Sequence, residues 1–171
     1  MKDIIIYTDG ACKYNPGPGG YAAIIMYEKH ISHLDDENDI IKKIVGGDKN
    51  TTNNIMELTA INKAFKYILE IVEKKENIAA IKKNSLNIYA YIDSNYVLKG
   101  LNEWSTNWIK KDFKGVKNSE LWKDTIRLYN DILKNNNIQI IFKKVKGHSG
   151  QKYNEIVDKL ASDKAKEIGG M

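Results

Sequence analysis

Cysteine is nearly missing from this sequence of 171 residues, and Cys12 is its only example. An internal disulfide is therefore impossible, and a zinc site built on several cysteines lacks its ligands. Long apolar runs are missing too, because the longest, residues 21–27, is far shorter than the roughly 20 residues that cross a bilayer. The N-terminus lacks the basic start, apolar stretch and small-residue cleavage site of a signal peptide. We expect a cytoplasmic protein in reducing surroundings, with no membrane partner.

Arginine is scarce as well, because Arg127 is the only one among the 27 basic residues and lysine supplies the rest. The net charge of 27 − 22 = +5 and the pI near 9.0 permit a polyanionic partner. Arginine favours bidentate readout of guanine, whereas lysine is a point charge that suits phosphate contacts. We therefore favour binding of nucleic acid without sequence preference. A general bias of composition toward Lys, Asn and Ile would also remove arginine.

The charges are distributed unevenly along the chain. In residues 28–48 acidic residues outnumber lysines, so this stretch would repel phosphate, whereas two later segments would attract it. One holds Lys110, Lys111, Lys114 and Lys117 among Trp104, Trp108 and Phe113, and the other holds Lys143, Lys144, Lys146 and Lys152 around His148.

The length fits one domain, and 42% hydrophobic with 29% charged residues is typical of a globular protein. No internal repeat or Pro/Ser-rich linker divides the chain, so residues 1–171 are expected to form a single domain. Apolar periodicity predicts a mixed sheet with helices on both faces, in the α/β class and in the order βββαβαααβα. The predicted strands are residues 4–8, 21–27, 40–45, 86–92 and 138–145, and the main helices begin near Ile55, Ser94, Ser119 and Tyr153. Residues 40–45 could also belong to a short helix.

Two acidic residues, Asp9 and Asp93, end predicted strands that would be parallel neighbours, so their carboxylates would face each other. Like charges held so close repel unless a metal neutralises them, and Mg²⁺ prefers hard oxygen ligands. Glu57 and Asp158 lie in the first turns of two helices, from which each could point toward the same sheet edge. The pattern predicts a site for divalent cations.

Each carboxylate also has an ordinary structural explanation. Asp9-Gly10 could be a simple turn, and Glu57 could close a capping box with Asn54 as N-cap. Asp93 could belong to a turn capped by Ser94, and Asp158 could pair with Lys159 or Lys164 on the helix surface.

The complete set of motifs resembles the ribonuclease HI family (type 1 ribonuclease H) along nearly the whole length. The first hairpin carries Tyr7-Thr-Asp-Gly-Ala-Cys and Asn15-Pro-Gly-Pro-Gly-Gly-Tyr21, and a helix opens with Thr51-Thr-Asn-Asn-Ile-Met-Glu57-Leu. Ile92-Asp-Ser-Asn-Tyr-Val97, Val145-Lys-Gly-His-Ser-Gly150 and Asn154-Glu-x-x-Asp158-x-Leu-Ala161 follow in the same order as in the family.

The resemblance implies a ribonuclease H-like fold, with five strands in the order 3-2-1-4-5. It implies that Asp9, Glu57, Asp93 and Asp158 bind two Mg²⁺ or Mn²⁺ ions roughly 4 Å apart. These ions would serve endonucleolytic hydrolysis of the RNA strand of RNA–DNA hybrids, leaving 5′-phosphate and 3′-hydroxyl ends. His148, on a Gly-flanked loop, would assist water activation or product release; as a lone loop histidine it could also be inert. The protein would act as a monomer, without a separate N-terminal hybrid-binding module.

The same resemblance assigns substrate contacts on both sides of the carboxylates. Cys12, through its backbone, and Asn15, Asn53 and Asn54 would meet the minor groove of the hybrid, and Thr52 would hold a DNA phosphate. Trp104, Asn107 and Trp108, with Lys110, Lys111 and Lys114, look like a basic protrusion that grips the DNA strand, although both tryptophans could simply be helix core.

Three features depart from the family pattern. Ile55 stands where well-known members carry a basic residue, and Asn95 replaces a longer Gln, which shortens its reach toward the minor groove. Residues 35–39 and 70–85 are expected to be insertions at the periphery.

A binding module without turnover and a DNA-directed transposase, integrase or resolvase core are the competing hypotheses. The complete carboxylate set with His148 argues against the first, and the Thr-Thr-Asn-Asn and Asn-Pro-Gly-Pro-Gly-Gly motifs argue against the second.

Overall fold

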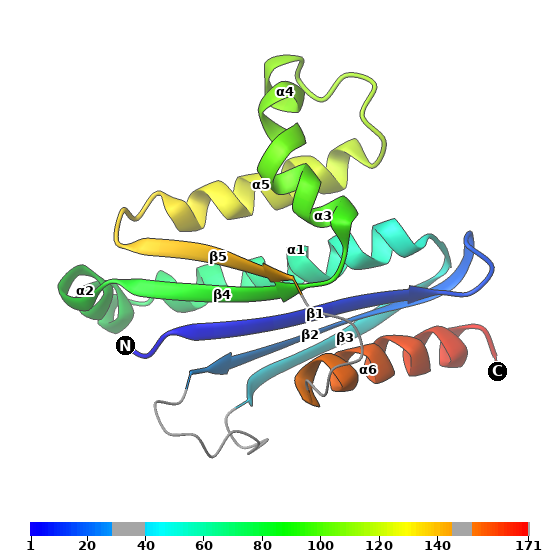
Figure 1. Cartoon of the computed structure of the whole chain (residues 1–171), viewed down its shortest axis with the longest axis horizontal. Coiled ribbons are helices and arrows are strands. Elements are labelled where there is room, and N and C mark those ends of the chain that lie inside the picture. Colours follow the sequence, from blue (N-terminus) through cyan, green and yellow to red (C-terminus); the bar gives the residue numbers. More distant parts are fainter. Residues whose placement is uncertain (29–39, 145–151, 171) are drawn as a thin grey trace.

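A computed structural model describes residues 1–28, 40–144 and 152–170 of the chain (Figure 1). Its centre is a five-stranded sheet in the order β3-β2-β1-β4-β5, which confirms the expected order. The strands are β1 (Ile4–Cys12), β2 (Gly17–Tyr27), β3 (Ile40–Thr51), β4 (Leu86–Ile92) and β5 (Ile138–Lys144). The first three form an antiparallel meander, whereas β4 is parallel to both β1 and β5. The mixed sheet predicted from the sequence is therefore present.

The meander strands are longer than predicted. β1 continues through Asp9 to Cys12, so the prediction that Asp9-Gly10 ends this strand is wrong. Asp9 and Gly10 stay in the sheet because they pair with Ala22 and Tyr21 of β2. The Gly-rich start of β2 was expected to be loop, but it enters the sheet as well.

Close approach to a helix explains one of these glycines. A Cβ at Gly20 would lie 2.3 Å from the Ala161 carbonyl oxygen, so only glycine lets this part of β2 meet the helix that covers it. β3 is a strand of 12 residues, which settles the choice between strand and short helix for residues 40–45.

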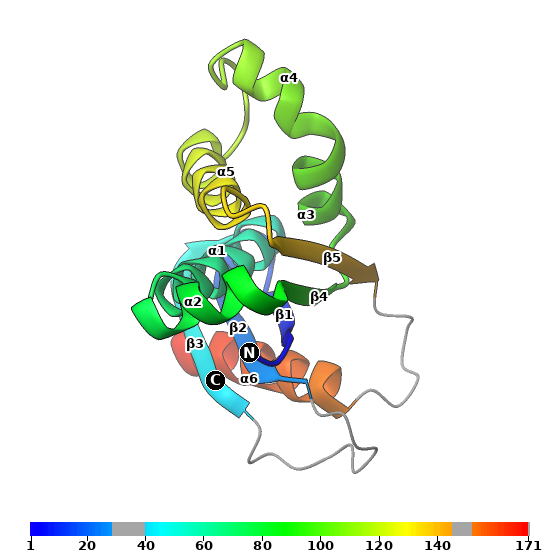
Figure 2. The ribbon, with the colours of Figure 1, turned by 90° about the vertical axis from the view of Figure 1, so that its left-hand side faces the viewer.

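Helices cover both faces of the sheet, as the sequence predicts (Figure 2). α1 (Asn53–Val72) lies on one face with α5 (Ser119–Leu133) packed beside it, and α6 (Lys152–Ile168) lies on the other. None of the helices in the described ranges is both long and apolar enough to cross a membrane.

α2 (Lys75–Asn84) is a helix that the sequence did not predict. Ile81 is its only buried residue, and Ile78 and Ile81 are its only large apolar residues, too few to establish a helical repeat from the sequence. It occupies the stretch expected to be a peripheral insertion, and it does lie at the periphery (Figure 1).

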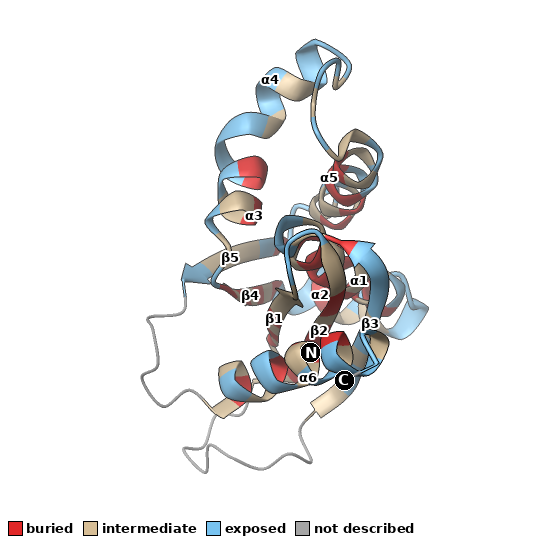
Figure 3. Ribbon diagram, turned by 90° about the vertical axis from the view of Figure 1, so that its right-hand side faces the viewer, coloured by how far each residue is buried: buried red, intermediate tan, exposed pale blue. Residues whose placement is uncertain are grey.

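Residues 95–118, between β4 and α5, rise away from the sheet, and we call them the protrusion (Figure 2). The protrusion contains α3 (Asn95–Lys99), a π-helical segment (Gly100–Trp104) and α4 (Ser105–Lys110). No residue of α4 is buried (Figure 3).

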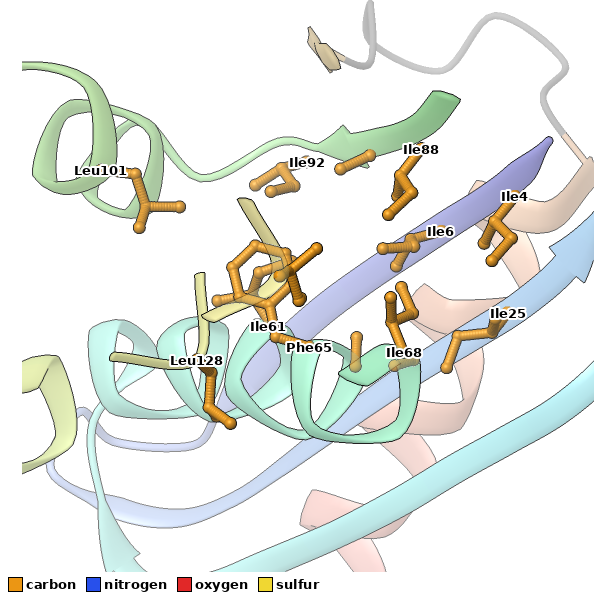
Figure 4. Close-up of a cluster of buried hydrophobic side chains, with 14 of the residues drawn as sticks. Ile4, Ile6, Ile25, Ile61, Phe65, Ile68, Ile88, Ile92, Leu101 and Leu128 are labelled. Carbon is orange, nitrogen blue, oxygen red and sulfur yellow. The ribbon is translucent and has the colours of Figure 1, made fainter. Parts of the chain in front are cut away.

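Alternation along β1 divides the core into two layers. Ile4 and Ile6 are fully buried in the larger cluster, together with Phe65 and Ile68 of α1 (Figure 4). The alternate residues Ile5 and Tyr7 pack instead against the cluster under α6. Successive strand residues point to opposite faces, so Asp9 belongs to the α6 face with Tyr7.

Candidate active site

The carboxylates gather where β1 and β4 diverge. The parallel register pairs Tyr7 with Tyr91, so Asp9 and Asp93 each lie two residues beyond this last pair. Asp93 is exposed and directly precedes Ser94, whose side chain caps α3 by accepting the Val97 N–H at 3.2 Å. Asp9 and Asp93 are thus neighbours, as expected. Ser94 also has the capping role proposed for it.

Glu57 reaches the same place from α1, and Gly10 makes this possible. A Cβ at Gly10 would lie 2.5 Å from the Glu57 backbone nitrogen, so β1 and the start of α1 approach more closely than any larger residue allows. The N-cap of α1 is Thr52, whose Oγ1 accepts the Ile55 N–H at 3.2 Å. The capping box with Asn54 as N-cap is therefore wrong, and Glu57 lies beyond the capping positions.

Burial has the largest effect on the ionisation of both Asp9 and Glu57. Burial, with a smaller contribution from Asp158, raises the pKa of Asp9 to about 6, although hydrogen bonds from Glu57 and from the Gly10 N–H act to lower it. Burial, followed by the charge of Asp9, raises the pKa of Glu57 to about 9, and Asp93 adds to this effect. Each of the four predicted ligands therefore lies close enough to another to act on its ionisation.

Asp158 is exposed on α6, the helix on the far side of Asp9 from α1. The lysines suggested as its partners are engaged elsewhere, because Lys159 pairs with Asp163 at 2.8 Å and Lys164 with Glu167 at 3.2 Å. The described residues thus give no support to a surface ion pair of Asp158 with either lysine.

The residues present fit a hard divalent cation. Glu57 Oε2 is buried and has no hydrogen-bond partner within the part of the chain that the structure describes, so it offers a dehydrated carboxylate oxygen. Within that part, no three Asp, Glu, His or Cys side chains form a ready-made cage for an ion. Mg²⁺ is commonly bound by one or two carboxylates and keeps several waters, so the paired carboxylates suit it.

The polar residues assigned to the minor groove surround the start of α1. The Asn53 N–H donates to Asn15 Oδ1 at 2.9 Å, which ties the first hairpin turn to the helix. Cys12 Sγ lies 3.3 Å from the Thr51 carbonyl oxygen, and the exposed Asn54 follows Asn53. Cys12, Asn15, Thr52, Asn53 and Asn54 therefore form one surface.

Asn95 is exposed in the first turn of α3 and has a partner that sequence reasoning did not assign. Lys144 Nζ donates to Asn95 Oδ1 at 3.0 Å. The strand register pairs Lys144 with Ile92, directly before Asp93. The sequence could not predict this contact because it depends on the register of β5 against β4. In the sequence, Lys144 was only one of several lysines near His148.

An aromatic cluster supports the protrusion. Trp108 lies 4.9 Å from Trp122, Trp104 lies 5.7 Å from Trp108, and the Trp122 Nε1–H donates to the Tyr96 hydroxyl at 2.7 Å. Both candidate tryptophans therefore have packing roles, although Trp104 keeps 37% of its surface exposed. The polar residues expected on the outside are exposed, namely Asn107, Lys110, Lys111 and Lys114.

Some predicted features lie outside the described residues. These are His148 with its motif at residues 145–150, and the acidic residues 35–39. Ile55, which stands where a basic residue was expected, is partly buried in the first turn of α1.

Similarity to known proteins identifies the family of this chain. A sequence model of the family described as RNase H matches residues 1–166. The chain belongs to the ribonuclease H family. Ribonuclease H of Hahella chejuensis is 39% identical to this ribonuclease H over 175 residues, covering 99% of this chain and 98% of its own length. Ribonuclease HI of Helicobacter pylori is also 39% identical, over 98% of this chain and 96% of its own.

Solved structures of the family share the fold. LC9-RNase H1, described as a type 1 RNase H with the type 2 active-site motif, has a TM-score of 0.69 at 23% identity, covering 98% of this chain and 74% of that one. LC11-RNase H1, solved in complex with an RNA/DNA hybrid, has a TM-score of 0.59 at 18% identity, covering 96% of this chain and 98% of that one. These TM-scores show that the chain has the ribonuclease H fold.

Proposed function

We propose that this ribonuclease H hydrolyses the RNA strand of RNA–DNA hybrids, without sequence preference, using two divalent metal ions. The observation that carries the proposal is the partly buried pair of Asp9 and Glu57, with Asp93 and Asp158 beside it, just beyond the last parallel pair of β1 and β4. A buried pair of carboxyl groups is unfavourable unless a cation or a proton compensates for it. The binding of a hybrid by LC11-RNase H1 supports this substrate class.

Asp9, Glu57, Asp93 and Asp158 would hold the ions. When bound, Mg²⁺ or Mn²⁺ ions lower the pKa of the attacking water and stabilise the charge on the leaving oxygen. Water then attacks the phosphorus and the bond from phosphorus to the 3′ oxygen breaks, which leaves a 5′-phosphate and a 3′-hydroxyl. We assign proton transfer or product release to His148, which lies outside the described residues.

Substrate binding would use the two surfaces on either side of the carboxylates. Asn15, Asn53 and Asn54 offer uncharged groups that can exchange hydrogen bonds with a 2′-hydroxyl, the group that distinguishes RNA from DNA. Thr52 would contact a DNA phosphate at the start of α1, where the helix dipole favours negative charge. The exposed lysines of the protrusion would add phosphate contacts without reading bases.

A strand-cleavage assay tests the proposal. The protein is incubated with labelled RNA–DNA hybrid, single-stranded RNA, duplex RNA and duplex DNA, with Mg²⁺ or with EDTA. We expect cleavage of the RNA strand of the hybrid alone, in Mg²⁺ alone, with 5′-phosphate ends. Binding of the hybrid without turnover would instead support the binding-module hypothesis, and cleavage of duplex DNA would support the DNA-directed one.

The variant Asp9→Asn is the matched test of the carboxylate site. It should abolish turnover while the metal-free protein folds and melts at the same or a higher temperature, because one of the repelling carboxylates is gone. Cleavage rates and thermal melts measure the two effects. Near-normal turnover of Asp9→Asn in Mg²⁺ would refute the two-ion site.

A further inference from the structure

On the α6 face of the sheet, close to the candidate metal ligands, Tyr7 contacts two other tyrosines, Tyr91 and Tyr153. The rings of Tyr7 and Tyr91 stack with their centroids 4.7 Å apart and their planes within 7°. The ring of Tyr153, from the first turn of α6, packs against Tyr7 at 5.6 Å with a tilt of 38°. We call Tyr7, Tyr91 and Tyr153 the aromatic trio.

Each member of the trio precedes one candidate ligand on its own segment of the chain. Tyr7 and Tyr91 form the last parallel pair of β1 and β4, and each stands two residues before an aspartate. Strand residues two apart share a face, so Tyr7 and Asp9 lie on the same side of β1. Tyr153 stands in the helix that carries the third aspartate. The three couples are Tyr7 with Asp9, Tyr91 with Asp93, and Tyr153 with Asp158.

α6 depends on such a contact more than the strands do. Backbone hydrogen bonds fix β1 against β4, whereas side-chain packing fixes α6 on the sheet. Its other buried residues, Val157, Ala161 and Ala165, are small, and Tyr153 is its only aromatic residue. Ile156 and Leu160 also pack on the sheet, but Tyr153 supplies the one aromatic contact of α6, at the end of the helix nearer Asp158.

We propose that the aromatic trio is a positioning device that holds Asp158 at the right place relative to Asp9 and Asp93, and so sets the affinity for divalent ions. This inference rests on the proposed function, since it concerns the same metal site. A ligand held by surrounding packing binds an ion better than one that must first be ordered, and loss of such support typically lowers metal affinity about 10- to 100-fold. The trio acts through the aspartates and does not need to touch the ion or the substrate.

Substitutions at Tyr153 distinguish the contribution of the aromatic ring from that of a buried apolar side chain. Tyr153→Phe keeps the ring, whereas Tyr153→Leu keeps an apolar side chain but removes the ring. Ile168→Ala is the control, because Ile168 packs at the far end of α6, where its Cδ1 would lie 2.4 Å from a Cβ at Gly47. This control loosens α6 without touching the trio. Tyr91→Leu tests the couple of Tyr91 and Asp93 independently. It takes the place of Tyr153→Leu in the experiment if Tyr153→Leu does not fold.

Metal binding is measured without substrate, by titrating each folded protein with Mn²⁺ and following free Mn²⁺ by electron paramagnetic resonance. We expect Tyr153→Leu and Tyr91→Leu to bind Mn²⁺ about 10-fold more weakly than wild type. Tyr153→Phe and Ile168→Ala should bind it as wild type does. In cleavage assays, raised Mn²⁺ should restore much of the rate of Tyr153→Leu.

Two results would overturn the proposal. One is wild-type Mn²⁺ affinity in both leucine variants, and the other is an equal loss in Ile168→Ala, which would reduce the trio to ordinary packing. The failure of the proposed function looks different, because wild-type protein would then show no Mn²⁺ binding that Asp9→Asn removes, or would cleave no hybrid.

Discussion

A single backbone position, Gly10, determines how closely the segments that carry Asp9 and Glu57 approach each other. Gly10 brings the start of α1 so close to β1 that two carboxyl groups lie partly buried beside each other. In water each group would ionise independently, but here burial disfavours the ionised form of both, and the charge of Asp9 disfavours that of Glu57 further. A cation between them relieves both effects, and without a cation a proton does so. The stability of the metal-free protein should therefore depend on pH.

The variant Glu57→Gln should remove much of this dependence. A carboxyl group whose pKa is raised by folding stabilises the protein below its ordinary value and loses this stability as pH rises through the folded value. For Glu57 this window runs from the ordinary 4.5 to about 9, and for Asp9 it runs from 3.8 to about 6. In EDTA, wild-type stability should fall as pH rises from 5 to 9, most steeply below pH 6, where both groups contribute, and above pH 6 through Glu57 alone.

Urea unfolding at several pH values, in EDTA, measures the effect. The midpoint for Glu57→Gln should change less than that of wild type between pH 6 and pH 9. The exposed Glu103→Gln is a control that should follow wild type. Parallel curves for wild type and Glu57→Gln would show that Glu57 ionises as freely as a surface residue.

The protrusion is an element held by aromatic packing on the α5 side of the molecule. Gly100 lies against Trp122, and a Cβ there would come within 2.0 Å of the indole ring. Trp122 is fully buried and packs against the rings of Tyr96 and Trp108. The orientation of the exposed lysines on this element therefore depends on a contact at its base.

Gly100→Ala should tilt or loosen the protrusion. Overpacking of this kind lowers the free energy of unfolding by about 1–3 kcal/mol. If the protrusion grips substrate, KM for hybrid should rise severalfold while kcat changes little, because the carboxylates are on other elements. Steady-state kinetics and urea unfolding check both points. Asn102→Ala, an exposed change in the same π-helical segment, is the control. A fall in kcat with unchanged KM would separate the protrusion from binding.

The lysines of the protrusion should contribute affinity that depends on salt. Each lysine that neutralises a phosphate releases counterions, so replacing Lys110, Lys111 and Lys114 with Ala should reduce the slope of log affinity against log salt by up to about three units. Binding is measured in an Asp9→Asn background with two hybrids of unrelated sequence, and both should lose affinity alike.

A matched control changes charge equally on another element. Lys75, Lys82 and Lys83 of α2 lie near the amino end of β4, so their replacement by Ala should leave the slope nearly unchanged. An equal reduction in both triple variants would indicate a general charge effect. A loss confined to one hybrid would contradict contacts made with phosphates alone.

At the scale of the whole molecule, sequence reasoning succeeded where one element suffices. Period-two alternation located β4 as residues 86–92, and helical spacing located α5 as residues 119–133. The proximity of Asp9 and Asp93 followed from the rule that carboxyl ends of parallel strands share an edge. The strand order came from the family resemblance.

Features that depend on contacts between elements could not be predicted in this way. Gly10 and Gly20 are explained only by the helices packed on them, and the bond from Lys144 to Asn95 needs the register of β5. α2 escaped notice because its helical residues are mostly in solvent, and the stacking of Tyr7 on Tyr91 needs the pairing of two distant strands.

The shallow attachment of α2 has a consequence for local opening. With Ile78 46% exposed, this helix can unfold while exposing only Ile81 of its own residues from the core, so its amide hydrogens should exchange with solvent through local fluctuations. Hydrogen exchange followed by mass spectrometry should show weaker protection in α2 than in α1, and added Mg²⁺ should slow exchange around Glu57 while leaving α2 unchanged. Equal protection of both helices would mean that α2 opens only with the whole fold. Since α2 leads into the end of β4 opposite Asp93, residue 78 is a place where a fluorescent label can be attached without reaching the carboxylates.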